Sequence, residues 1–174
     1  YVPAGEPVEV VVVQPNVDPY KEKFGGVHPL EQLDRMLAQA EPSITPKTAL
    51  VVYPETALQE PFNLEFDAAG PIFHGLWEND IPGSRTYRRV RAFQHRHPEL
   101  AFLGGMSSGL LFAPGADLPR SARLLGESGR GFDAHNAALF IRPDGSNEVY
   151  HKSKLVPGVE LMPFEEVLGP LSSL

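Results

Sequence analysis

Ala49-Leu50-Val51-Val52-Tyr53-Pro54-Glu55-Thr56 is the stretch that decides the fold. Its first five residues form a continuous apolar run, which is typical of a strand buried on both faces. The run stops at Pro54-Glu55-Thr56, so a carboxylate stands just past the carboxyl end of the expected strand. Ligand sites of layered α/β folds form at that end of their strands. The stretch therefore predicts a parallel sheet that places Glu55 at a site.

The segments around this strand alternate between strand and helix patterns. A β-branched run at 8–13 predicts another strand, and Pro29 begins a helix with an apolar stripe at helical spacing. An N-cap at Ser84 predicts a second helix to about His97, and 100–103 predicts a strand ended by Gly104-Gly105. The region 57–83, which separates the strand that ends at Tyr53 from the helix capped by Ser84, is expected to be rich in loops. The stripe of the first helix consists of Leu30, Leu33, Met36, Leu37 and Ala40.

Two further strand-like runs, 136–141 and 147–151, flank Arg142-Pro143-Asp144-Gly145-Ser146. A Pro-Asp-Gly turn between such runs predicts an antiparallel hairpin. The whole order is strand, helix, strand, helix, strand and hairpin. It predicts an α/β layered fold with helices packed on a sheet and parallel early strands. A length of 174 residues suits one domain, so 1–174 is taken as a single unit.

Composition excludes several classes of function. The chain has 22 acidic and 15 basic residues and a net charge of −7, so no nucleic-acid partner is expected. No apolar run approaches the ~18 residues of a membrane helix. The 174 residues contain no cysteine, and the six histidines show no metal-binding spacing. We therefore expect neither a metal nor another cofactor.

Three charged residues are candidates for chemistry. Glu55 suits a general base, although a solvated or capping glutamate is the alternative. Lys152 follows the second hairpin strand and could stabilise an oxyanion, a role for which Lys154 competes from the same face. Glu160 lies between two prolines in an apolar loop, where it either supports Lys152 or is solvated.

Two other features have two interpretations each. Trp77 is either a core residue or a substrate-contacting lid residue near a membrane surface. The basic run in the second expected helix favours an amphipathic helix with a solvated basic face, and contact with anionic lipid headgroups is the alternative. Its basic residues are Arg85, Arg88, Arg89, Arg91, His95, Arg96 and His97.

Four stretches together resemble the apolipoprotein N-acyltransferases, a membrane-anchored branch of the nitrilase superfamily. The first is Val10-Val11-Val12-Val13-Gln14-Pro15-Asn16, and the second is Val51 to Ala57 with its Pro-Glu-Thr motif. The third is the hairpin from Asn136 to Gly145. The fourth and most specific is Tyr150 to Glu160, in which Leu-Val-Pro with a glutamate soon after points to the acyltransferase branch.

This resemblance implies a nitrilase-like αββα sandwich, of which the chain would be the N-terminal part. It implies that Glu55 is the general base, that Lys152 stabilises the tetrahedral oxyanion and that Glu160 supports that site. Phe24 is the nearest match to an aromatic substrate-contacting residue that follows the Gln-x-Asn turn in the family.

The implied reaction is acyl transfer from a phospholipid, through a cysteine thioester, to the N-terminal amine of a diacylglyceryl-cysteine apolipoprotein. The implied location is the extracytoplasmic side of the bacterial inner membrane, with membrane helices outside these 174 residues. The family's nucleophilic cysteine follows the lysine motif, so we expect a fragment that is inactive alone. The alternatives are a soluble nitrilase- or amidase-type hydrolase and a catalytically dead nitrilase-like binding domain.

Overall fold

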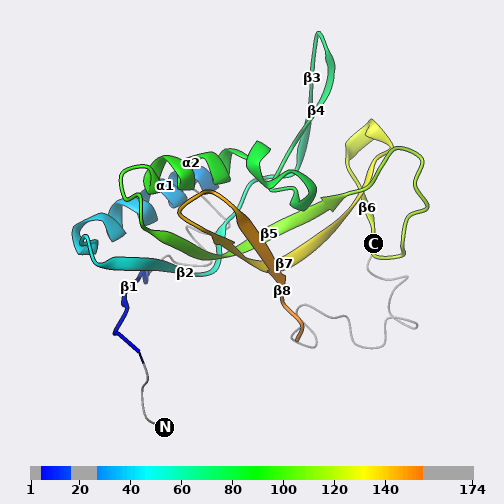
Figure 1. Cartoon of the computed structure of the whole chain (residues 1–174). Coiled ribbons are helices and arrows are strands. Elements are labelled where there is room, and N and C mark those ends of the chain that lie inside the picture. The colour runs from blue at the N-terminus through cyan, green and yellow to red at the C-terminus, as the bar shows by residue number, and fades with distance from the viewer. Residues whose placement is uncertain (1–4, 17–26, 155–174) are drawn as a thin grey trace.

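A mixed sheet organises the structure, which is a computed structural model that describes residues 5–16 and 27–154 (Figure 1). Its strands are β1 (Glu9–Val12), β2 (Thr48–Leu58), β5 (Ala101–Leu111), β6 (Arg123–Leu124), β7 (Gly131–Ile141) and β8 (Asn147–His151). The order across the sheet is β1-β2-β5-β7-β6, and β8 also pairs with β7. Within the described residues the fold is thus mixed α/β, as the alternating sequence pattern predicts.

The strand directions follow the predicted pattern. β1, β2 and β5 pair in parallel, whereas β7 is antiparallel to both β5 and β8. The β7–β8 hairpin closes through residues 142–146, where Gly145 adopts a φ of +91°. β8 consequently runs in the same direction as β2 and β5. The carboxyl ends of these three strands point the same way, which matters for Glu55 and Lys152.

Helices α1 (Pro29–Ala40) and α2 (Arg85–Gln94) cover one face of the sheet (Figure 1). All five residues of the predicted α1 stripe are buried, and all of them except Leu30 belong to one core cluster with Val51 and Phe102 of the sheet. Burial of each such large side chain stabilises the fold by about 1.5–3 kcal/mol. Neither helix, nor any other described helix, is long and apolar enough to cross a membrane.

The basic residues of α2 make contacts within the molecule. Arg89 pairs with Asp34 of α1, and Arg96 pairs with Glu41 at 3.2 Å. The Arg96 guanidinium, more than any other neighbour, holds the pKa of the Glu41 carboxyl below its usual value. Arg91 donates to the backbone oxygens of Arg142 and Pro143 in the hairpin turn. The amphipathic interpretation of this helix is confirmed, because Val90 and Phe93 are buried whereas Arg85 and Arg88 are exposed; several of the basic side chains also link elements.

Three local predictions are wrong. β5 continues through Gly104-Gly105 instead of ending there, and Glu55 lies within β2 instead of after it. The 57–83 region contains the hairpin β3 (Asn63–Asp67) and β4 (Gly70–His74), followed by the 3-10 helix η3 (Glu78–Gly83). This hairpin projects from the body of the molecule (Figure 1). Short 3-10 turns also occur at Glu41–Ser43 and Gly126–Ser128.

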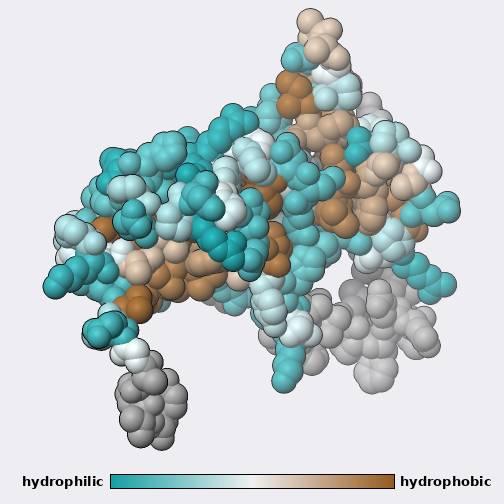
Figure 2. Space-filling view, viewed as in Figure 1, coloured by the Kyte–Doolittle hydropathy of each residue, from teal (hydrophilic) through white to brown (hydrophobic). Residues whose placement is uncertain are grey.

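The sheet face opposite the helices carries apolar side chains that remain accessible. Val10 and Val12 of β1 are 43% and 73% exposed. Strand register aligns Val12 with Val52, and Val52 with Leu103, which are both half-buried. Figure 2 shows apolar surface below the helices in this region. We call this surface the open face.

Ser84 provides a direct test of how α2 begins. Its side-chain oxygen accepts a hydrogen bond from the backbone N–H of Tyr87, as the predicted N-cap requires. Ser84→Ala should lower the free energy of unfolding by about 1 kcal/mol in urea denaturation. The matched control is Ser43→Ala at an exposed 3-10 position, which should change stability by less than about 0.5 kcal/mol. Equal effects of the two changes would refute the capping role.

Candidate active site

Glu55 lies on a bulge where β2 leaves its pairing with β5. Tyr53 pairs with Gly104, and Leu58 pairs with Met106, so five steps along β2 correspond to two along β5. Thr56, inside this bulge, has a φ of +53°. A β-branched residue rarely adopts that conformation, and such strain costs on the order of 1–3 kcal/mol. The strained backbone of the bulge therefore sets the position of the Glu55 carboxylate.

Gly105 makes the bulge possible. A Cβ atom at Gly105 would lie 2.6 Å from the Cα of Glu55 and 2.8 Å from both the oxygen of Pro54 and the nitrogen of Thr56. These are backbone atoms, which a change of rotamer cannot move away. Alternation along β5 directs Gly105 away from the helices, so the bulge crosses on the open face. This close approach of the β2 backbone explains why position 105 needs a glycine.

Lys152 and Asn136 both reach the Glu55 carboxylate. The Nζ of Lys152 donates to Glu55 Oε1 at 3.1 Å, and the Nδ2 of Asn136 donates to the same oxygen at 2.6 Å. The backbone N–H of Lys152 also bonds to the Asn136 oxygen at 2.9 Å, which fixes the end of β8 on β7. The structure thus brings together two predicted site residues that are 97 positions apart.

The Glu55 and Lys152 side chains are exposed to different extents. The Glu55 side chain is 59% exposed and that of Lys152 is 29% exposed. An ion pair this accessible contributes about 0–1 kcal/mol to the stability of the fold. Stability therefore does not explain why these two side chains meet. Lys154 is exposed beyond the end of β8, so Lys152 is the lysine that the geometry assigns to the site.

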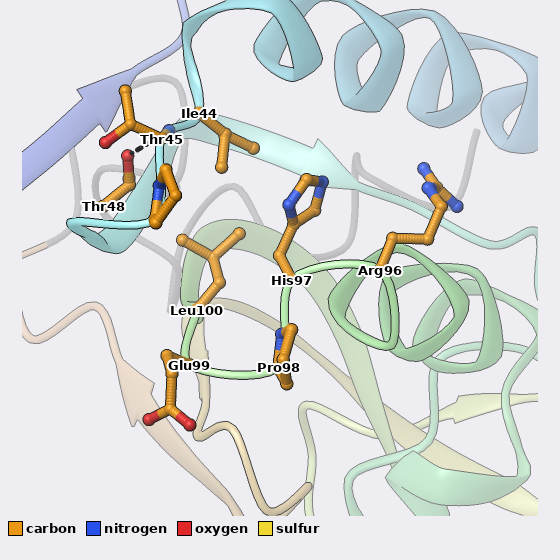
Figure 3. Close-up of a pocket in the computed structure, with 9 residues that line it drawn as sticks. Ile44, Thr45, Thr48, Arg96, His97, Pro98, Glu99 and Leu100 are labelled. Carbon is orange, nitrogen blue, oxygen red and sulfur yellow. Dashed lines mark hydrogen bonds between the residues drawn. The ribbon is translucent and has the colours of Figure 1, made fainter.

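Two hollows lie at opposite ends of the parallel strands. One, of about 170 Å³, is lined by Glu55 and Thr56 together with Gln14 and Pro15, which follow β1. The other, of about 310 Å³, lies at the amino ends of β2 and β5 (Figure 3). The second is larger, but Glu55 lines the first. We therefore place the candidate site at the carboxyl ends of the strands.

The remaining predicted site residues have different outcomes. Trp77 is 5% exposed; its ring stacks on Phe62 at 4.7 Å, and its Nε1 donates to the Phe73 oxygen. This places it in a packed aromatic cluster, in agreement with the core interpretation, and a substrate contact stays a prediction. Phe24 and Glu160 lie outside the described residues.

Asn136 is the site residue that sequence reasoning missed. It was recognised as the start of a hairpin strand, but its side chain was given no role. The register of the β7–β8 hairpin indicates that Asn136 lies near the site, because a backbone hydrogen bond links it to Lys152 and puts the two residues side by side. That pairing puts the two side chains on one face, whereas their contact with Glu55 depends on the β2 bulge.

Comparison with known proteins identifies no family. No protein-family model matches the chain, and no curated protein sequence is significantly similar to it. The assignment of a function therefore rests on the residues and geometry described above.

The Gly105 contact predicts a sharp difference between neighbouring glycines. Gly105→Ala should reduce the free energy of unfolding by about 1–3 kcal/mol, because the new methyl group collides with β2 backbone. It should also displace Glu55, which solution NMR would register as shifts at Glu55 and Asn136. The control, Gly104→Ala, meets only the side chains of Phe102 and Leu58, so its shifts should centre on the core. Unchanged Glu55 resonances in Gly105→Ala would contradict this role.

Proposed function

We propose that this chain is catalytic-domain sequence of an apolipoprotein N-acyltransferase, in which Glu55 is the general base and Lys152 stabilises the oxyanion. The observation that carries the proposal is the contact between the Lys152 ammonium and the Glu55 carboxylate. It involves the two residues that the sequence resemblance singles out, and it lies at the shared carboxyl end of β2 and β8. Asn136 adds a positioning role by donating to the same carboxylate oxygen.

The proposed reaction needs a cysteine thiol, and since the 174 residues contain none, the proposal requires one from outside them. Glu55 takes the thiol proton, and the thiolate attacks the ester carbonyl of a phospholipid. Lys152 stabilises the negative oxygen of the tetrahedral intermediate, and Glu55 returns the proton to the departing lysophospholipid. The apolipoprotein's amine then attacks the thioester, and its proton passes through Glu55 to the regenerated thiol. No cofactor takes part in either half-reaction.

We further propose that the open face is covered by a second sheet layer, as a nitrilase-like αββα sandwich requires. The accessible Val10 and Val12 support this layering, because an unpaired apolar sheet face is costly in water. The bulge that holds Glu55 crosses on the same face. A second layer there would shield the carboxylate that is now more than half exposed.

The β3–β4 hairpin supports a membrane-facing location for this domain. Phe66 and Ile72, which lie on paired strands near its turn, are 72% and 38% exposed. The hairpin projects well away from the sheet (Figure 1), as a segment that dips into a lipid surface must. On this proposal the domain lies on the extracytoplasmic side of the bacterial inner membrane and takes its acyl donor from the bilayer.

The hairpin proposal predicts a specific loss of vesicle binding. Phe66→Ser should weaken binding to phosphatidylethanolamine–phosphatidylglycerol vesicles, measured by sedimentation, by about ten- to a hundredfold, since burying one phenyl ring contributes about 1.5–3 kcal/mol. Val8→Ser is the matched control, because Val8 is 67% exposed but lies beside β1. Similar losses for both variants, or none for Phe66→Ser, would contradict insertion of the hairpin.

Acylation of the full-length protein in membranes tests the proposed function. Wild-type protein should acquire a hydroxylamine-sensitive acyl group from labelled phospholipid. Glu55→Gln and Lys152→Ala should each reduce that labelling at least about 100-fold, because one loses the base and the other the oxyanion partner. Lys154→Ala, an exposed neighbour, should label normally.

Protein levels and thermal unfolding separate chemistry from folding in this experiment. All three variants should accumulate as folded protein, since the Glu55–Lys152 pair contributes little to stability. Wild-type protein that never acquires label but releases ammonia from amides or nitriles would replace the acyltransferase proposal with a hydrolase. Full labelling of Glu55→Gln would exclude Glu55 as the base.

A further inference from the structure

Glu78, His135 and His151 form a second cluster of reactive side chains. Glu78 Oε1 lies 2.9 Å from His135 Nδ1, and Glu78 Oε2 lies 2.8 Å from His151 Nε2. One ligand atom from each of the three residues lies within 4.8 Å of the others. The two imidazole rings are also close, with centroids 4.4 Å apart. The three residues come from η3, β7 and β8, so tertiary structure alone assembles them.

This cluster lies behind the candidate active site. His135 precedes Asn136 in β7, and His151 precedes Lys152 at the end of β8. Because side chains of neighbouring strand residues point to opposite faces, the histidines face the helix side of the sheet. Asn136 and Lys152 face the other side, where they meet Glu55. The two clusters therefore share backbone but not side chains.

The Glu78 carboxylate is well prepared to carry a negative charge. Its side chain is only 11% exposed, and it also accepts a hydrogen bond from Ser108 Oγ at 2.7 Å. A largely buried carboxylate that contacts two imidazoles is the donor set of a His₂Glu metal site.

We propose that Glu78, His135 and His151 bind a divalent transition-metal ion of the zinc type. Zinc bonds of about 2.0–2.1 Å in a tetrahedron put ligand atoms about 3.3 Å apart. The two short Glu–His contacts use different carboxylate oxygens, whereas one ligand atom from each residue lies within 4.8 Å of the others. Rotation of the side chains must therefore bring these atoms closer by up to about 1.5 Å. Imidazole nitrogen and carboxylate oxygen suit zinc better than magnesium or calcium. His151 is half exposed, which gives the ion a path from solvent and leaves a position for water.

Such an ion would hold together the elements that carry the candidate active site. It would tie η3 to the middle of β7 and the end of β8, next to Asn136 and Lys152. Ser108 is the outer partner that orients the Glu78 carboxylate. This proposal does not depend on the acyltransferase assignment, since it concerns metal binding and strand order rather than turnover.

Zinc titration of the chelator-treated, tag-free protein tests the site. Competition with a chromogenic zinc indicator should give one equivalent bound per chain, and zinc should raise the unfolding temperature. His135→Ala and His151→Ala should each weaken binding by more than about tenfold, and Ser108→Ala by about tenfold. His95→Ala is the matched control, because His95 is exposed and lies outside the cluster. It should bind zinc as tightly as wild type.

His151→Gln guards against loss of folding, because glutamine retains a hydrogen bond to Glu78 but is a poor zinc ligand. It should unfold like the metal-free wild type and bind zinc more than about tenfold more weakly. Absence of stoichiometric zinc binding in wild type would overturn the proposal. Wild-type affinity in both His135→Ala and His151→Gln, or an equal loss in His95→Ala, would also overturn it.

Discussion

The close passage of β2 over Gly105 is the constraint on which the site depends. With a Cβ atom at that position, the backbone of Pro54, Glu55 and Thr56 could not occupy its place. The resulting bulge interrupts the β2–β5 ladder, puts Thr56 at positive φ and lifts Glu55 onto the open face. Local strain of this kind persists only where surrounding packing holds it. Here the buried core under β2 and β5 supplies that packing.

The strand directions bring other polar side chains to the Glu55 bulge. β2 and β8 run the same way, with β5 and β7 between them, so their carboxyl ends share one edge of the sheet. The β7–β8 hairpin then brings Lys152 beside Asn136, and both donate to Glu55. Immediately behind them, His135 and His151 hold Glu78 on the opposite face. One hairpin thus presents different chemistry on each side.

Much of this arrangement was predictable because local signals agreed with tertiary structure. The α1 stripe, the Ser84 cap and the 136–151 hairpin have strong periodic or turn signals, and each formed as expected. The prediction that a strand ends at Gly104-Gly105 is wrong, because glycine here allows the β2 backbone to approach β5 closely. The β3–β4 hairpin was missed although Asn63 to Asp67 alternates polar and apolar residues, because each of its strands is only five residues long.

The second cluster was missed for a different reason. Its members lie 57 and 73 positions apart from Glu78, so no local spacing motif connects them. Only the hairpin register brings the two histidines together, and only the packing of η3 on β5 adds the glutamate, through Ser108. Sequence patterns predict elements and their order well, whereas contacts between distant elements follow from packing that no short window contains.

Zero-length carbodiimide cross-linking is the most direct test of the meeting of Glu55 and Lys152. The reagent joins a carboxylate to an amine only when they touch, and mass spectrometry of the digested protein identifies the joined peptides. The 3.1 Å contact predicts an isopeptide bond between Glu55 and Lys152, which should disappear in Lys152→Arg. A cross-link from Glu55 to Lys154 instead, or none from Glu55 in folded protein, would contradict the proposed site.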